Sequence, residues 1–330
     1  MKEVSPKVKE LLGEYRDITE MVTYWRKGVS PNRVLAEEAR WEVPEEFAIK
    51  VAPVGAYITR KGNPNQVYST TEIREQLMDS IDAGACAIHV HCRTPEGHHT
   101  LDLKLVHEII DPIKEKYGRK VLIDGCPEGG RTFDESTAPL IEFKDVIETA
   151  PITCAAVWWA DSLTAVTEES VIGHVKIMQE LGQKPELVVH DAGSIDQAYR
   201  WVIRPGIYKK PTFWRLCLGE PSLGTMYSPE AMMDLYTYCI RRILEIDADA
   251  KVLISMCGRG ALWQMAFSAL MSPPVIGVRM GMEDSIWMYP HKDEKIPDNP
   301  TIIKAFVDIL KLIGRRPATA DEFRKAIGIN

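Results

Sequence analysis

The chain has 330 residues, of which 45% are hydrophobic and 26% are charged. These proportions are typical of globular proteins and exclude a disordered or fibrous chain. Forty Lys and Arg residues against 47 Asp and Glu residues give a net charge of -7, with no run of five like charges, which argues against nucleic acid or a membrane surface as a partner.

Residues 1–46 form a charged, helix-prone segment whose bulky side chains are Trp25 and Trp41. The segment lacks the uninterrupted apolar core of a secretory signal, which predicts a cytoplasmic protein. An extension of this kind would expose apolar area, so we expect it to pack on the main domain or to join copies of the chain in a homo-oligomer, a dimer or a tetramer. The chain is thus predicted to consist of an N-terminal helical extension, residues 1–46, and one domain over residues 47–330.

Beyond residue 46, short runs rich in Val and Ile alternate with longer helical stretches. The predicted strands are 49–57, 86–91, 120–124, 152–157, 186–190, 212–218, 252–256 and 275–279. The predicted helices are 71–83, 103–117, 135–148, 162–181, 195–202, 229–246, 261–270 and 301–313. Eight βα units in succession favour a closed (β/α)8 TIM barrel, whose active sites lie at the carboxyl ends of the strands. The longest uncharged stretch, 260–278, contains polar residues and a Pro pair, so we expect it inside the domain rather than in a membrane.

Two histidines lie in the second predicted strand. His89 and His91 are separated by one residue, so their side chains project from the same face of the strand at its carboxyl end. Two imidazoles in this position predict a metal site. One core histidine with a chance neighbour would give the same spacing.

The eighth predicted strand supplies an acidic partner. Arg279, Gly281 and Glu283 alternate along it, so that Arg279 and Glu283 point into the same mouth as the histidines if the strand continues. Two histidines and one carboxylate leave an open position on a catalytic zinc ion, which makes Glu283 the expected third ligand. Arg279 and Asp284 remain for acid–base work or anion binding. Without the histidine pair, a surface ion pair would explain these charges equally well.

Glycine-rich loops follow two other predicted strands. Gly129 and Gly130 come after the third strand, and Gly258, Arg259 and Gly260 come after the seventh. Loops at this end of a barrel offer backbone N–H groups and a cation to a carboxylate or phosphate. Glycine-rich turns are as often only turns.

Aromatic and histidine side chains lie near other strand ends. Tyr57 and Trp158 end the first and fourth predicted strands and form either an aromatic wall of the site or plain barrel packing. His98 and His99 fall in a polar turn and are expected to face solvent. His190 ends the fifth predicted strand, where a lone histidine is more often structural. The seven cysteines form no CxxC pair and are expected to be reduced core residues.

These motifs, taken together, resemble the β-keto acid cleavage enzyme family, whose founding activity is 3-keto-5-aminohexanoate cleavage. The resemblance extends from about Val51 to Ile329. It rests on four blocks in the expected order and spacing: GACAIHVHCR at 84–93, LGEP at 218–221, VRMGMEDS at 278–285 and LIGRRPAT at 312–319.

The resemblance implies a zinc-dependent barrel that takes a β-keto acid and acetyl-CoA and gives acetoacetate and a new acyl-CoA. His89, His91 and Glu283 would bind the zinc ion, and Asp284, paired with Arg279, would remove the proton between the two carbonyl groups. We expect the remaining contacts from the loops at the mouth. For acetyl-CoA these are Gly258, Arg259 and Gly260; for the keto acid they are Tyr57, Gly129, Gly130 and Trp158.

The sequence departs from the family pattern around the substrate. Tyr57 follows Gly-Ala at the position where amine-accepting members carry an acid, so we expect a substrate other than the 5-amino acid. Tyr57, Trp158 and Trp159 suggest one option, an aromatic cage for a quaternary ammonium keto acid. Two other functions remain open at this point: a zinc-dependent barrel hydrolase, and a catalytically silent metal-binding relative.

Overall fold

A computed structural model describes residues 5–7, 10, 38–40, 42–159, 162–219, 228–259, 261–263, 266 and 273–329. The chain divides into two units, Met1–Val43 and Pro44–Asn330. Trp25 and Trp41 lie outside the described residues, so the role of the extension stays a prediction. The second unit contains the barrel.

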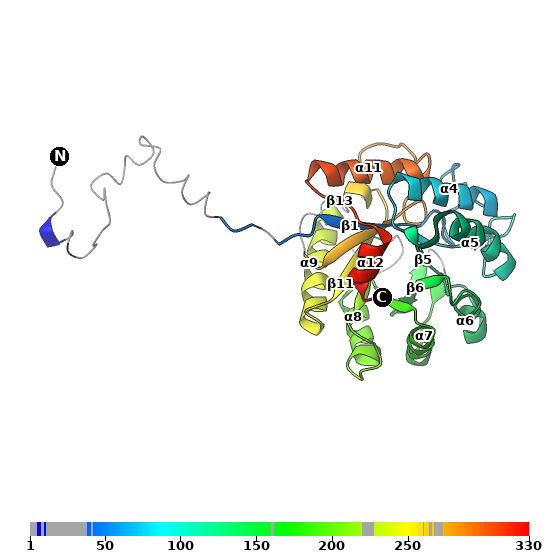
Figure 1. The fold of residues 1–330 in the computed structure, drawn as a ribbon, viewed down its shortest axis with the longest axis horizontal. Helices are drawn as coiled ribbons and strands as arrows, with labels where there is room; N and C mark the ends of the chain where they lie inside the picture. The colour runs from blue at the N-terminus through cyan, green and yellow to red at the C-terminus, as the bar shows by residue number, and fades with distance from the viewer. Residues whose placement is uncertain are drawn as a thin grey trace. The chain divides into compact units, whose positions relative to one another are not determined.

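Eight parallel strands close into a barrel (Figure 1), because β12 pairs with β1. Around the barrel they are β1 (Glu46–Val51), β2 (Ala87–His89), β5 (Leu122–Asp124), β6 (Ile147–Thr153), β9 (Lys184–Val189), β10 (Phe213–Leu218), β11 (Lys251–Met256) and β12 (Val275–Met280). A short ninth strand, β13 (Arg316–Pro317), pairs with the amino end of β1. The predicted (β/α)8 barrel is confirmed.

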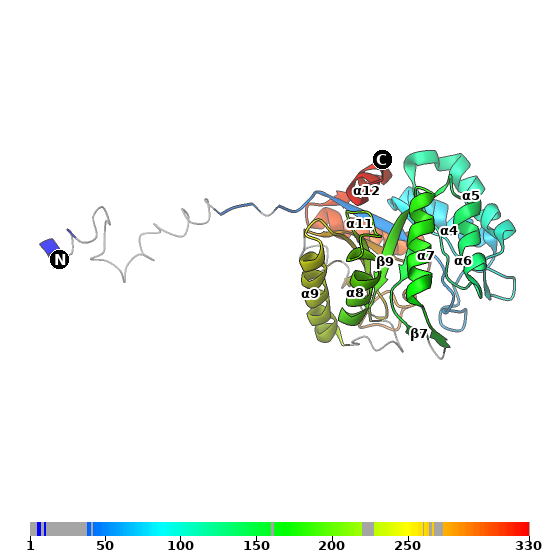
Figure 2. The ribbon, with the colours of Figure 1, turned by 90° about the horizontal axis from the view of Figure 1, so that it is seen from below.

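Helices cover the outside of the barrel, each packed on the next in chain order from α4 to α9 (Figures 1 and 2). They are α4 (Thr70–Ala83), α5 (Leu103–Tyr117), α6 (Phe133–Glu142), α7 (Glu168–Glu180), α8 (Ala192–Ala198) with its π-helical extension η3 (Tyr199–Ile203), and α9 (Pro229–Ile246); α11 (Asn299–Leu312) packs on α4, and α12 (Ala320–Ile327) follows. Side-chain caps fix where several begin. Ser69 and Glu72 form a capping box at α4, and Ser228 caps α9 with Pro229 at its start.

Several predicted boundaries were wrong in the fourth βα unit. The fourth barrel strand runs from Ile147 to Thr153, so the helix predicted to reach residue 148 ends at Glu142. The segment after it forms an antiparallel hairpin of β7 (Val157–Trp159) and β8 (Ser162–Thr164), so the next helix begins at Glu168 rather than at residue 162. The apolar run 152–157 therefore belongs partly to a barrel strand and partly to a hairpin.

The two ends of the barrel are built differently. At the amino end, Phe323 and Ile327 of α12 pack against small and apolar interior side chains, among them Ala87, Leu122 and Phe213, and close the barrel. Interior positions further along the strands carry charged and polar residues instead, such as Lys50. The carboxyl end is therefore the one that can hold chemistry.

The remaining sequence expectations on the fold concern cysteines and membrane spans. All seven cysteines are described; they are buried and form no disulfide, as expected of reduced core residues. None of the helices in the described part of the chain combines the length and the apolar character that a bilayer crossing requires.

Candidate active site

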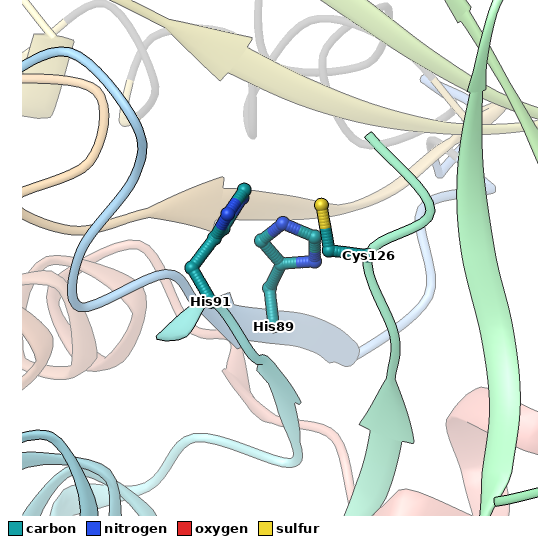
Figure 3. A group of neighbouring side chains, drawn as sticks. All are labelled: His89, His91 and Cys126. Atoms are coloured by element: carbon teal, nitrogen blue, oxygen red, sulfur yellow. The ribbon is translucent and has the colours of Figure 1, made fainter. Parts of the chain in front are cut away.

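His89 and His91 lie at the carboxyl end of β2 (Figure 3). His89 is the last residue of the strand and His91 follows two residues later. Their rings meet edge to face with centroids 4.7 Å apart, and the residues are only 1% and 5% exposed. The two imidazoles therefore share one face, as their spacing predicts.

Glu283 joins the two histidines from the last βα unit. Its Oε2 lies 3.8 Å from Nε2 of His89 and 3.5 Å from Nε2 of His91. Gly55 makes room for it, because a Cβ there would collide with the Glu283 side chain. The three predicted metal ligands are thus brought together by β1, β2 and β12.

The backbone that delivers Glu283 differs from the one predicted. β12 ends at Met280, and residues 281–284 form a turn rather than a continued strand. Gly281 has a φ of 151° and lies against β1, so that a Cβ would collide with the carbonyl oxygen of Ala52. The turn brings both Glu283 and Asp284 back toward Arg279, whereas a straight strand would have pointed only one of them inward.

Arg279 holds both carboxylates of this turn. Its Nη1 donates to Oε1 of Glu283 at 2.6 Å, and its Nη2 donates to Oδ1 of Asp284. The other carboxylate oxygen of Asp284, Oδ2, accepts a hydrogen bond from the hydroxyl of Ser255 at 3.1 Å. The guanidinium therefore fixes the position of an acidic pair beside the histidines.

The two carboxylates have pKa values displaced in opposite directions. Burial raises the pKa of Asp284 to about 7, and the charge of Glu283 adds to this, against the effect of Arg279. Burial would raise the pKa of Glu283 as well, but Arg279 and the two histidines hold that pKa well below its usual range. Such a divergence suits one carboxylate to proton transfer and the other to binding a cation.

Asp124 orients His89 from behind. Oδ2 of Asp124 accepts a hydrogen bond from Nδ1 of His89 at 2.7 Å, which leaves Nε2 facing Glu283. Asp124 is held in turn by Lys50, whose Nζ lies 3.1 Å away, and by the hydroxyl of Thr149. This histidine–carboxylate pair, which the sequence did not reveal, is typical of metal ligands.

The ion pairs continue through the barrel interior. Nζ of Lys50 also lies 2.8 Å from Oε1 of Glu186, whose Oε2 lies 3.1 Å from Nε of Arg215. All of these side chains are at most 5% exposed. Side chains of alternating charge therefore form a continuous row beneath the site, from Asp124 on β5 through Lys50 on β1 and Glu186 on β9 to Arg215 on β10.

Cys126 is a further neighbour of the histidines. His89, His91 and Cys126 each offer one ligand atom, and these atoms lie within 4.8 Å of one another (Figure 3). From the sequence, Cys126 is expected to be an ordinary reduced core cysteine, which does not indicate this position. The structure explains its place: His89 pairs with Asp124, so His91 and Cys126 each come two residues past a paired position, and this register is not visible in the sequence.

His99 was placed wrongly by the sequence. Its ring packs edge to face on His91, with centroids 4.8 Å apart, and its Nε2 is buried. The reason is a short hairpin in which β3 (Cys92–Arg93) pairs with β4 (His99–Thr100) and turns His99 back over the site. His98 is exposed, as expected.

Several buried polar atoms around the site have no hydrogen-bond partner among the described residues. They are Nδ1 of His91, Oε2 of Glu283, Nε of Arg279 and Nε2 of His99. Such atoms also occur elsewhere in the barrel, for example in Glu186 and Arg215, but at this site several of them converge, which points to a bound ion or ligand. The donor set of imidazoles and a carboxylate fits a zinc-type metal ion.

Two of the predicted glycine-rich loops lie near this centre, since Gly129 lies against His99 and Gly258 contacts Asp284. Gly129 and Gly130 line a cavity of about 280 Å³ that also involves Glu128 and Thr153. The N–H of Gly258 donates to the backbone carbonyl of Asp284 at 3.4 Å.

Other predicted contacts lie further from the centre. At the surface, Arg259 forms an ion pair with Asp293. The Cζ atom of its guanidinium lies 3.9 Å from the centroid of the Trp287 ring. Tyr57 is 47% exposed in the loop after β1, which ends six residues earlier than predicted.

Some predicted positions cannot be placed. Trp158 and Trp159 belong to β7 rather than to the fourth barrel strand, and their side chains lie outside what the structure describes. Gly260 and the Glu-Pro pair of the LGEP block also lie outside the described residues. His190, buried at the end of β9, interacts with Cys217 of the adjoining strand.

Comparison with known proteins decides the family. The model of the beta-keto acid cleavage enzyme family matches residues 46–329. The chain belongs to this family. The 3-keto-5-aminohexanoate cleavage enzyme of Acetoanaerobium sticklandii is 28% identical over 296 residues, which cover 87% of this chain and 99% of that protein. The resemblance inferred from the four sequence blocks is confirmed.

More distant relatives share the same architecture. The 3-dehydrocarnitine:acetyl-CoA trimethylamine transferase of Rhizobium meliloti is 22% identical over 303 residues, covering 86% of this chain and 96% of that protein. The apo structure of ObcA superposes with a TM-score of 0.66 at 17% identity, covering 81% of this chain and 66% of that chain. The superposition on ObcA shows a shared barrel fold.

Proposed function

We propose that this protein is a zinc-dependent β-keto acid cleavage enzyme that converts a β-keto acid and acetyl-CoA into acetoacetate and a new acyl-CoA. The observation that carries the proposal is the convergence of His89, His91 and Glu283 with the Arg279–Asp284 pair at one end of the barrel. Membership of the family supports this function over a barrel hydrolase.

His89, His91 and Glu283 are the residues that would hold the zinc ion. When bound, a metal ion acts as a Lewis acid that polarises a carbonyl oxygen and lowers the cost of forming an enolate. Asp124 keeps His89 in the tautomer that presents Nε2 to the site. Arg279 keeps Glu283 ionised and in place.

Asp284 is the base in this proposal. Its carboxylate takes the proton from the carbon between the keto group and the carboxylate of the substrate. Arg279 and Ser255 hold it in position for that transfer. A carboxyl whose pKa lies near 7 is matched to proton transfer at neutral pH, because it can accept the proton and return it.

The remaining steps of the reaction need no reactant besides the β-keto acid and acetyl-CoA. The carbanion attacks the acetyl carbonyl carbon, the C–S bond breaks, and CoA leaves as a thiolate. The thiolate then attacks the original keto carbon, and the bond from that carbon to the former carbanion carbon breaks. Acetoacetate leaves after its carbanion takes the proton back from Asp284, and CoA remains on the shortened acyl group.

The substrate is proposed to differ from the 5-amino acid of the curated relatives. Tyr57 stands where amine-accepting members carry an acid, and an aromatic ring attracts a quaternary ammonium group through its face. A relative named for 3-dehydrocarnitine and trimethylamine supports a substrate of that type. We propose Trp158 and Trp159 as further members of this cage, Gly129 and Gly130 as keto-acid contacts, and Gly258, Arg259 and Gly260 as acetyl-CoA contacts.

Label tracking tests the function directly. The full chain is incubated with acetyl-CoA carrying carbon-13 in the acetyl group and with a panel of neutral, amine-bearing and quaternary ammonium β-keto acids, and products are identified by mass spectrometry. Label in acetoacetate together with an unlabelled new acyl-CoA is the expected result. Hydrolysis of acetyl-CoA to labelled acetate and free CoA, with no new acyl-CoA, would contradict the proposal. So would the absence of any product from every keto acid.

A further inference from the structure

We propose that Cys126 is a fourth protein ligand of the metal ion, which closes the resting site, and that a chelating β-keto acid takes the place of its sulfur. This inference rests on the proposed function, because it concerns the same metal ion. It adds a ligand to the set of His89, His91 and Glu283 and states what substrate binding must displace.

The position of Cys126 is the first observation. Its sulfur comes within 4.8 Å of a ligand nitrogen of each histidine, and Figure 3 shows it beside the ring of His89. The side chain is 5% exposed. The thiol donates to the carbonyl oxygen of Glu128 across 3.9 Å, a long and therefore weak hydrogen bond.

The backbone holds Cys126 at that level of the barrel. β2 and β5 pair in register from Ala87 with Leu122 to His89 with Asp124, and His91 and Cys126 each follow two residues after that last pair. The N–H of Gly125 donates to the carbonyl oxygen of Thr149 at 2.9 Å, which ties the residue before Cys126 to β6. The sulfur is thus presented to the metal site by the same strand ends that present the histidines.

The unsatisfied atoms are the second, independent observation. His91 is only 5% exposed, yet its Nδ1 has no hydrogen-bond partner among the described residues. Oε2 of Glu283 is also buried without such a partner. A cavity of about 10 Å³ lies against His91, His99 and Cys126, room for about one water-sized group. Two imidazoles and a thiol whose ligand atoms lie within 4.8 Å of one another, beside a carboxylate, are a donor set that a metal ion would bring together.

The chemistry follows from the number of ligands. Two histidines and one carboxylate leave an open position on zinc, whereas a fourth ligand completes a tetrahedron. On metal binding the thiol proton passes to solvent and a sulfur–metal bond forms. A keto acid that binds through its keto and carboxylate oxygens breaks that bond, and the thiolate recovers a proton from solvent. A soft sulfur ligand also favours zinc over magnesium or manganese.

Cobalt(II) substitution of the full chain tests this ligand by spectroscopy. A thiolate ligand gives cobalt(II) a charge-transfer absorption band in the near ultraviolet, which imidazole and carboxylate ligands do not. The wild type is expected to bind one cobalt ion per chain and to show the band. Cys126→Ser is expected to bind one cobalt ion without the band. Cys92→Ser is the matched control, because Cys92 lines the same small cavity but is not in the ligand group, and it should keep the band.

Addition of acetoacetate tests the exchange. This β-keto acid should abolish the band of the wild type while the cobalt content stays the same. X-ray absorption of the zinc-loaded wild type gives a second measurement that needs no substitution, and it should show one sulfur neighbour at about 2.3 Å.

The outcomes separate this inference from the proposed function. Bound cobalt without a band in the wild type, or a band that survives in Cys126→Ser, overturns the role of Cys126 and leaves the proposed function standing. A band that saturating acetoacetate does not change overturns the exchange. Failure of the wild type to bind cobalt or zinc contradicts the metal site itself and with it the proposed function.

Discussion

The interior of the barrel and its mouth both contain buried charged side chains, but the charges are paired differently in the two regions. In the interior, Lys50 lies between Asp124 and Glu186, and Glu186 faces Arg215, with every pair at 2.8 to 3.1 Å. At the mouth, Nδ1 of His91 and Oε2 of Glu283 are buried without a hydrogen-bond partner among the described residues, and the imidazoles that face Oε2 of Glu283 are 3.5 and 3.8 Å away. In the interior, Oε2 of Glu186 and Nε of Arg215 also lack a hydrogen bond within the described part of the chain, but they face each other as an ion pair at 3.1 Å.

This difference separates support from function. When one partner of a buried ion pair is removed, the protein loses stability, because the other charge is left buried and unpaired. Polar groups that converge without partners are instead arranged for something that binds between them. Asp124 belongs to both regions, since it pairs with Lys50 and also orients His89. The comparison therefore predicts which substitutions affect catalysis, stability or metal binding.

The largest effect is expected at the mouth, from Asp284→Asn. Loss of the base should lower keto-acid cleavage by a factor of about 10² to 10⁴, while the variant stays folded. The check is the rate of new acyl-CoA formation, measured beside a far-ultraviolet circular dichroism spectrum. Asp234→Asn, on the exposed face of α9, is the control and should leave the rate unchanged. A loss of less than tenfold in Asp284→Asn would remove this residue from the role of base.

In the interior, Lys50→Met should lower stability. Methionine leaves the carboxylates of Asp124 and Glu186 without their shared cation, which should lower the free energy of unfolding by about 3 to 5 kcal/mol. Urea denaturation followed by tryptophan fluorescence measures it. Lys176→Met, at an exposed position of α7, serves as the control. A change no larger than that of the control would show that the interior ion pairs do not stabilise the barrel.

Where the two regions meet, Asp124→Asn should weaken metal binding. An amide oxygen can still accept the hydrogen bond from His89, but it carries no charge to strengthen the ligand, so zinc affinity should fall by about 10-fold to 100-fold. Competition with a chromophoric chelator gives the affinity, and Asp145→Asn in the exposed turn before β6 is the control. Unchanged affinity would mean that Asp124 acts only in the interior ion pairs.

The smallest effect is expected away from both regions, at Glu322 of α12. Its carboxylate accepts hydrogen bonds from Arg316 and from the N–H of Thr319, and these hold its pKa at about 2. The resulting stability is fully present above the ordinary value of 4.5 and is lost as the pH falls toward 2.

Glu322→Gln should therefore cost about 0.5 kcal/mol at neutral pH, because solvent screens this partly exposed pair. Thermal unfolding of the variant and the wild type between pH 7 and pH 4 measures the difference, which should shrink toward the acid end. A difference that grows on acidification would contradict the direction of the pKa shift.

The residues that the sequence placed correctly follow from simple periodicity. Alternation put His89 and His91 on one face, and eight βα units put their strand end at the mouth of a barrel. The sequence also brought Arg279 and Glu283 to the site, but Glu283 for a wrong reason, since a turn at Gly281 rather than a continued strand delivers it.

What the sequence missed depends on register between strands and on short hairpins. Asp124 and Cys126 reach the site because β5 pairs with β2 in one particular register, which a single sequence does not reveal. His99 reaches it through a hairpin of two-residue strands. Lys50, Glu186 and their partners are single charges within apolar runs, and only the closed barrel shows that they meet.

Metal content tests the central claim most directly. Wild type, His89→Ala and His91→Ala are purified without added metal and analysed for zinc by elemental analysis. His107→Ala, a histidine at the surface of α5, is the matched control. We expect about one zinc ion per chain in the wild type and in the control, and loss of most of it in both site variants. Equal zinc in all four proteins, or none in the wild type after zinc is supplied, would contradict it.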